Sequence, residues 1–204
     1  MSEHQPIPKV AEIAAPAHPS ENLGSKEVLK NVTVIRLTQE DEAMLPEYVA
    51  LIRQSILDIP QPKEVLEDIL ENQTIEKYTE RLRDSNYFLY TARDTEGNLI
   101  GASYGVIRSK PGVSEQYKTV GHFGMTVVHP ESRGLRIGGQ LKDAFEQDCA
   151  KREIPKMTTF VYDTNRASIA MNQRMGMREI TDDPVLAPQD GGRYYAKDTP
   201  PLKT

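Results

Sequence analysis

Short runs of β-branched and aromatic residues alternate along the chain with longer segments of helical periodicity, a pattern typical of an α/β domain. The polar segment Glu96-Gly97-Asn98 separates two apolar runs and predicts a hairpin turn between them. Apolar runs of strand length predict strands at 32–37, 87–92, 99–107, 118–128, 157–162 and 193–196.

Three long segments have helical spacing instead. Thr38, with Asp41 three residues later, forms a capping-box start, and an apolar face follows it. A second helix is expected over 62–84, where a break near 72–74 can split it. A third helix, over 138–152, follows the strand that ends near residue 128 and carries an apolar stripe of Ile137, Leu141, Ala144, Phe145 and Cys149.

The ends of the chain differ from its middle. Residues 1–30 are rich in Pro, Ala, Glu and Ser and show no sustained period, so we expect a mobile tail there. Residues 31–198 form one expected domain, and residues 199–204 form a short C-terminal tail. The connection over 182–192 is long, and no internal repeat is apparent.

Composition narrows the class of protein. The hydrophobic content of 38% is enough for a single core, and the lone Cys149 rules out an intramolecular disulfide. We expect Cys149 to be a buried small hydrophobe in a protein of a reducing compartment. Neither a membrane-spanning run nor a secretory signal is visible, so the expected location is the cytoplasm.

The net charge of −5 argues against a nucleic-acid partner, because such proteins present a basic face. Positive charge used to hold an anionic ligand must therefore be local. Arg133, Arg136 and Lys142 are the expected sources of it.

The segment from Val127 to Gly139 carries the clearest chemical signal. A β-branched strand enters Pro130, a glycine-containing turn follows, and a helix begins. Free N–H groups and the dipole of a helix N-terminus bind phosphate, and glycine lets the ligand approach the backbone. The turn lacks the lysine and hydroxyl of a Walker loop, and it lacks the Gly-x-Gly-x-x-Gly spacing of a dinucleotide fold. Nucleotide hydrolysis is excluded on that ground.

Two motifs are similar to those of the GNAT N-acetyltransferases. The phosphate-loop pattern Gln/Arg-x-x-Gly-x-Gly/Ala of that superfamily matches Arg133-Gly134-Leu135-Arg136-Ile137-Gly138. Its C-terminal helix, roughly Asn-x-x-Ala/Ser-x-x-x-Tyr-x-x-x-Gly-Phe, resembles the segment from Asn165 to Met177, including Ser168. The resemblance spans residues 32–183.

The resemblance implies a GNAT fold, with a mixed, twisted sheet of about seven strands and helices on both faces. It implies transfer of an acetyl or other short acyl group from coenzyme A to a primary amine, by direct attack in a ternary complex. Acetyl-CoA would be the cosubstrate, with no metal, and the acceptor a small-molecule or peptide amine. A homodimer is compatible with this interpretation. The implied cofactor-binding residues are Thr126, Val127, Val128, Arg133, Gly134, Leu135, Arg136, Ile137, Gly138, Gly139, Asn165 and Ser168.

His122 is the candidate general base. Counted back from Val128 without gaps, it falls where the histone-acetyltransferase branch carries a catalytic glutamate, and histidine accepts protons near neutral pH. The alternative is a structural histidine. A bulge in this strand, which Gly121 and Gly124 permit, would change which face His122 occupies.

Asn172 is the second catalytic candidate. The family tyrosine that acts as general acid toward the coenzyme A sulfur is replaced here by asparagine. Asparagine donates a hydrogen bond but delivers no proton. Water, Tyr162 or Tyr194 could then protonate the thiolate, or the thiolate could leave unaided. This departure also keeps open an alternative function, a non-catalytic acyl-CoA-binding or regulatory module.

Overall fold

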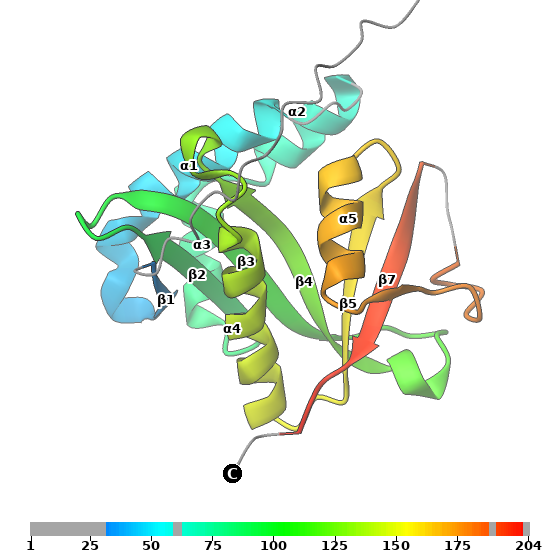
Figure 1. Cartoon of the computed structure of the whole chain (residues 1–204). Helices are drawn as coiled ribbons and strands as arrows, with labels where there is room; N and C mark the ends of the chain where they lie inside the picture. The colour runs from blue at the N-terminus through cyan, green and yellow to red at the C-terminus, as the bar shows by residue number, and fades with distance from the viewer. Residues whose placement is uncertain (1–31, 59–62, 188–190, 202–204) are drawn as a thin grey trace, which may run out of the picture.

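The computed structural model describes residues 32–58, 63–187 and 191–201. The expected N-terminal tail, residues 1–30, and the last part of the C-terminal tail, residues 202–204, lie outside the described residues. The described part forms a seven-stranded sheet in the order β1-β2-β3-β4-β5-β7-β6 (Figure 1). Every neighbouring pair is antiparallel except β4 and β5, which are parallel. The predicted mixed sheet of about seven strands is confirmed.

The strands lie close to their predicted positions. They are β1 (Thr33–Leu37), β2 (Tyr87–Arg93), β3 (Leu99–Ser109), β4 (Thr119–Val128), β5 (Lys156–Tyr162), β6 (Arg178–Glu179) and β7 (Gly192–Asp198). The predicted hairpin joins β2 and β3, with Gly97 at φ +87° in its turn. The two-residue strand β6 was not predicted, because so short a segment has no measurable period.

The helices lie close to the segments in which helical spacing predicted them. The Thr38–Asp41 capping box is present, although it opens a 3₁₀ helix, Gln39–Met44, that precedes α1 (Leu45–Leu57). The expected helix over 62–84 is divided into α2 (Lys63–Glu71) and α3 (Ile75–Arg83), and Thr74 caps the second piece. The remaining helices are α4 (Ile137–Lys151) and α5 (Arg166–Arg174).

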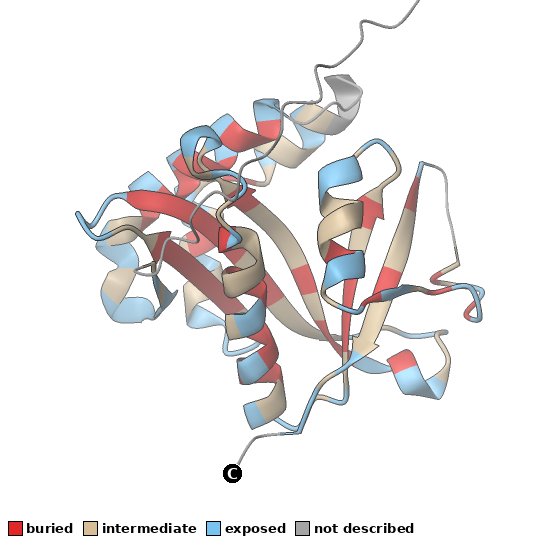
Figure 2. Cartoon of the chain, in the orientation of Figure 1, coloured by how far each residue is buried: buried red, intermediate tan, exposed pale blue. Residues whose placement is uncertain are grey.

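Helices cover both faces of the sheet, as predicted. Figure 1 shows α4 and α5 on one face and α1 to α3 on the other. Phe145 and Cys149 of α4 are fully buried in the core of the first face, and Tyr48 and Ile52 of α1 in the core of the second. Figure 2 shows buried segments along the sheet and on the helices that cover it. Burial also raises the pKa of the Cys149 thiol to about 12, so this cysteine is a packed, protonated side chain.

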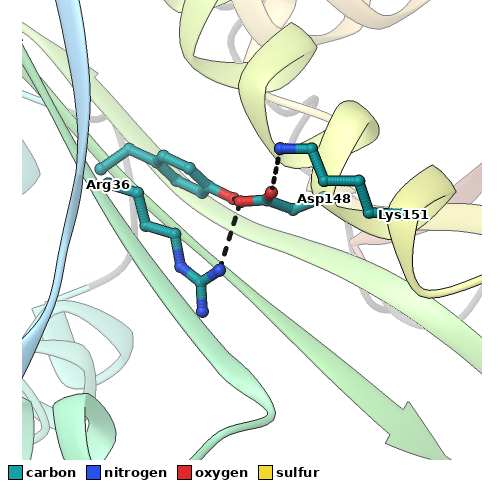
Figure 3. Close-up of polar contacts among 4 residues, drawn as sticks. Arg36, Asp148 and Lys151 are labelled. Carbon is teal, nitrogen blue, oxygen red and sulfur yellow. Dashed lines mark hydrogen bonds and ion pairs between the residues drawn. The ribbon is translucent and has the colours of Figure 1, made fainter.

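A buried carboxylate fixes α4 to the first strands. Asp148 accepts a hydrogen bond from the Tyr90 hydroxyl at 2.8 Å, and Lys151 lies 3.0 Å away on the same helix. Arg36 of β1 approaches the same carboxylate at 3.6 Å (Figure 3). Charge-assisted contacts of this kind hold a helix in a defined register on the sheet.

A bulge interrupts β4. Ser103 pairs with Thr126 and Gly105 with Phe123, so β4 carries one more residue than β3 across this interval. As a result Phe123 packs in the core under α4, whereas Val127 packs in the core against α1. Unbroken alternation would place these two side chains on the same face.

Beyond this bulge β4 separates from β5. The two strands pair only at Gly121 with Met157 and at His122 with Thr158. The second half of β4, from Phe123 onward, therefore does not pair with β5. Its backbone N–H and C=O groups on that side are available to another partner.

Candidate functional site

A cleft of about 780 Å³ opens where β4 and β5 separate. One wall is the second half of β4, the opposite wall comprises β5 and the start of α5, and residues of α1 and α2 lie at one end. The cleft reaches Gly138 at the start of α4. Thr126, Val127 and Val128, three of the predicted cofactor-binding residues, all line it.

The loop between β4 and α4 presents a helix N-terminus to this cleft. Gly134 adopts φ +86°, and Arg136 precedes the helix at φ +62°, in the left-handed region. This backbone conformation favours glycine, so a side chain at Arg136 is held there at a conformational cost. No side chain caps the helix at Arg136, so its first N–H groups keep their capacity to bind an anion.

Gly138 and Gly139 leave the surface of this helix start bare. A Cβ on Gly138 would lie 3.1 Å from Met171 Sδ and 3.6 Å from Thr126 Cγ2, between α5 and β4. A Cβ on Gly139 would meet nothing within 4 Å. Ile137, by contrast, is buried and holds the helix start against the core. The predicted loop thus combines an anchored helix with an uncovered backbone.

The three cations expected to hold an anion have different surroundings. Arg133 donates to Val128 O at 3.2 Å and to Asp58 at 2.9 Å. Arg136 lines a second, shallower hollow together with Arg174 and Lys197. The expectation that Lys142 supplies positive charge directly to an anionic ligand at the loop is wrong, because Lys142 is fully buried and turned toward the interior. Its position in the helix, three residues before Phe145, places it on the buried side.

Asn165 caps α5. Its Oδ1 accepts a hydrogen bond from the Ser168 backbone N–H at 3.1 Å. Both residues also line the cleft. The capping role that asparagine favours is therefore present, and it leaves the Asn165 amide nitrogen and the Ser168 hydroxyl on the cleft side of the helix start.

His122 lies at the base of the cleft, where β4 and β5 stop pairing. Its Nδ1 is 3.0 Å from Arg108 Nη2 and 3.2 Å from Thr158 Oγ1. A guanidinium only donates, so Nδ1 accepts and the neutral ring carries its proton on Nε2. Burial, with the nearby Arg108 charge, lowers the pKa of His122 to about 3. These contacts favour a neutral, hydrogen-bonded ring.

The bulge also changes the face on which His122 lies. A Cβ on Gly121 would meet Cys149 of α4, so Gly121 and Phe123 point toward α4 and His122 points to the other face. The gap-free count from Val128 that suggested the base role does not hold across the bulge. His122 as base stays a prediction, now without that support.

Asn172 is 1% exposed and lines the cleft. Its Oδ1 accepts a hydrogen bond from the Lys142 ammonium, and its Nδ2 is buried without a hydrogen-bond partner in the described part of the chain. Lys142 also lies 2.7 Å from Met177 Sδ and 5.2 Å from the centre of the Phe123 ring. Burial, together with the charge of Lys197, lowers the pKa of Lys142 to about 7.

The sequence analysis did not identify Arg108 and Asp58 as residues that shape this site. It named Lys142 but did not predict that this side chain is buried. The burial of Lys142 could have been predicted from spacing, because Lys142 stands three residues before Phe145 and seven before Cys149, both on the buried stripe of the helix. Arg108 and Asp58 act across long sequence separations, and no local pattern announces such contacts.

The fold and the cleft are those of a known family. The model of the Acetyltransferase (GNAT) family matches residues 53–177, more than half of the chain. The chain belongs to this family and is an acyltransferase enzyme of the GNAT type. A search of curated proteins returns no match.

Solved structures support the same fold at low identity. The PaiA N-acetyltransferase from Thermoplasma acidophilum, in complex with coenzyme A, is 15% identical with a TM-score of 0.63, covering 82% of this chain and 98% of that one. A GNAT-family acetyltransferase from Staphylococcus aureus Mu50 is 17% identical with a TM-score of 0.59, covering 83% and 99%. The aminoglycoside N-acetyltransferase AAC(6')-Iy, in complex with CoA, is 18% identical with a TM-score of 0.55, covering 71% and 86%.

Within the described residues, no helix has the length and apolarity needed to cross a membrane.

Proposed function

We propose that this protein transfers an acetyl or other short acyl group from coenzyme A to a primary amine, by direct attack in a ternary complex. One observation carries the proposal: the unpaired half of β4 lines a cleft that ends at the uncovered N-terminus of α4. An extended pantetheine chain adds to a free strand edge through main-chain hydrogen bonds, and a pyrophosphate suits the helix N-terminus. Similar proteins crystallised with CoA support the choice of cosubstrate.

The proposed chemistry needs a donor for the thioester oxygen. A backbone N–H in Thr126–Val128 would polarise the carbonyl as the amine attacks, because it is preorganised by the pairing of this segment with β3. A covalent acyl-cysteine is not part of the proposal. Cys149 is the only cysteine of the chain and lies in the core with a raised pKa.

The proton of the attacking amine has two routes, to His122 or to water in the cleft. Arg108 and Thr158 occupy Nδ1 of His122, the only ring nitrogen that could accept. The contacts of His122 therefore favour water, with the ring as a hydrogen-bonding group in the wall of the cleft.

The acceptor would enter from the end of the cleft formed by α1 and α2. Asp68 lines this end together with Ser55 and Asn72, and Asp58, which also lies there, is ion-paired with Arg133. The Asp68 carboxylate at the entrance favours a cationic amine over an anionic acceptor. We propose a small-molecule or peptide amine of that charge as the acceptor class.

The test is release of free thiol from acetyl-CoA in the presence of polyamines, amino acids, aminoglycosides and peptide N-termini. At least one amine is expected to give turnover above the rate of hydrolysis without acceptor. Binding of acetyl-CoA with no turnover by any amine would favour the non-catalytic module. Absence of binding at millimolar acetyl-CoA would contradict both functions.

A further inference from the structure

Lys142 and Asn172 form a buried donor chain that ends in the cleft. Lys142 of α4 is 0% exposed, and its ammonium donates to Asn172 Oδ1 of α5. The Asn172 Nδ2 at the other end of the amide is buried, has no hydrogen-bond partner among the residues that the structure describes, and belongs to a residue lining the cleft. A buried N–H group without a partner is costly, so its presence beside a ligand cleft points to a ligand acceptor.

We propose that Lys142 is a positioning residue that polarises the Asn172 amide, so that Asn172 Nδ2 donates to the coenzyme A sulfur and stabilises the thiolate. The inference rests on the proposed function and names how the leaving group is stabilised without a tyrosine. As the acceptor nitrogen forms its bond to the acyl carbon, the C–S bond breaks and its electron pair stays on sulfur. The excess proton of the acceptor nitrogen goes to water, and the thiolate is held by Asn172.

The contacts of Lys142 leave it few other roles. Among the described residues, its ammonium contacts Met177 Sδ and the face of Phe123 besides Asn172, and both of these groups are soft or aromatic. The nearest carboxylate on its own helix face, Glu146, is paired with Lys197 at 2.5 Å. The ammonium therefore acts mainly on the amide oxygen, and a charge-assisted hydrogen bond at one end of an amide strengthens its N–H donors at the other.

The charged groups around Lys142 set its titration. Asp143 and Glu146 lie on α4, Lys197 lies on β7, and His122 lies on β4. Asn172 and Met177 contribute no titrating group. The charge on Lys142 is lost near pH 7 in the free protein. A thiolate held by Asn172 would restore that charge, because an opposite charge nearby favours the ammonium.

The coupling between the charge on Lys142 and the thiolate predicts a bell-shaped pH dependence of the affinity that the sulfur adds to coenzyme A binding. Below about pH 7, forming the ammonium–thiolate pair from a charged Lys142 and a neutral thiol releases a proton, so affinity rises with pH. Above the thiol pKa of about 8.5, forming the pair takes up a proton, so affinity falls. The maximum lies between these values.

The test compares coenzyme A with desulfo-coenzyme A, which lacks the sulfur, by calorimetry from about pH 6 to about pH 10. Wild type is expected to bind coenzyme A about tenfold to hundredfold more tightly near the maximum, the range expected for a hydrogen bond to a charged group. Lys142→Met and Asn172→Ala should each reduce this ratio to near one and flatten its pH dependence. The double variant should be no worse than either single variant, because both act on one chain of contacts.

Lys151→Met is the matched control, since it removes an exposed lysine from the same helix and should leave the ratio unchanged. Thermal melting verifies that each variant is folded. Equal binding of the two ligands by wild type, or an unchanged ratio in Lys142→Met, would overturn this inference alone. Failure of wild type to bind either ligand would refute it together with the proposed function.

Discussion

Arg133, the first residue of the phosphate-loop motif, is joined to Asp58 at the end of α1 by an ion pair of 2.9 Å. The two side chains are about half exposed, at 51% and 47%, so the pair contributes little to stability. Its effect is positional, because it connects the loop that precedes α4 to the acceptor end of the cleft.

We expect Asp58→Asn to tighten coenzyme A binding severalfold, because it frees the Arg133 guanidinium and removes a negative charge near the phosphates.

Arg133→Ala should weaken binding by about tenfold or less and reduce the salt dependence of the dissociation constant, as for the loss of one exposed charge–phosphate contact. Titration of both variants at low and high salt checks this. Weaker binding in Asp58→Asn would instead mean that the ion pair itself holds the loop in its binding conformation.

Gly138→Asp should abolish the rise in melting temperature that acetyl-CoA produces in wild type. The new carboxylate would lie between Met171 and Thr126 at the helix start, where it crowds the cleft and repels phosphate. Gly139→Ala is the control for the cost of losing a loop glycine, since its Cβ has free space. A full ligand-induced shift in Gly138→Asp would place the phosphates elsewhere.

His122→Gln tests the base role through pH. With its pKa near 3, His122 does not titrate near pH 6.5, so the acidic limb of kcat/KM should be the same in wild type and variant. Loss of an acidic limb near pH 6.5 in the variant, with cofactor affinity intact, would establish His122 as the base. The measurement requires only an acceptor that supports turnover.

The same histidine affects stability in acid. Its folded-state pKa, about 3, lies below the ordinary value of 6.5, so the unfolded chain binds the proton first as pH falls. Wild type therefore loses stability from this group between about pH 6.5 and about pH 3, whereas His122→Gln does not. Denaturant unfolding should show a shallower loss with acid in the variant. Parallel curves would mean that the imidazolium is accommodated in the folded state.

Lys142→Met should stabilise the fold at neutral pH while weakening the function proposed for Lys142. The pKa of Lys142 is about 7 in the folded state and 10.5 ordinarily, so as pH falls from 10.5 the unfolded chain binds the proton before the folded chain does. The resulting loss of folding stability is complete below about pH 7. Removing a buried charge raises the free energy of unfolding by about 1–4 kcal/mol. The gain is smaller here because the Asn172 oxygen loses its hydrogen-bond donor. Unfolding at about pH 6 and about pH 10 should show the larger gain at the lower pH. A destabilised variant would make Lys142 a structural residue.

Local sequence patterns predicted most of the elements. The capping box at Thr38, the turn at Gly97 and the break before Thr74 depend on contacts within a few residues, and all are present. The two GNAT motifs also lie in continuous segments, and the family model matches residues 53–177, a range that contains both. The face that His122 occupies could not be read from the sequence, because one bulged residue in β4 reverses the alternation between His122 and Val128, and the only sequence sign of the bulge was two glycines.

Residue types and short spacings are enough to predict the order of the elements, the glycine-containing turn after β4 and the lack of tyrosine at position 172. The surroundings of Lys142, by contrast, exist only in the folded chain. Its side chain acquires a function from Asn172, 30 residues away on another helix, and from the burial that lowers its pKa. Such effects depend on which surfaces are removed from water when α4 and α5 pack on one face of the sheet, and a one-dimensional pattern does not contain that information.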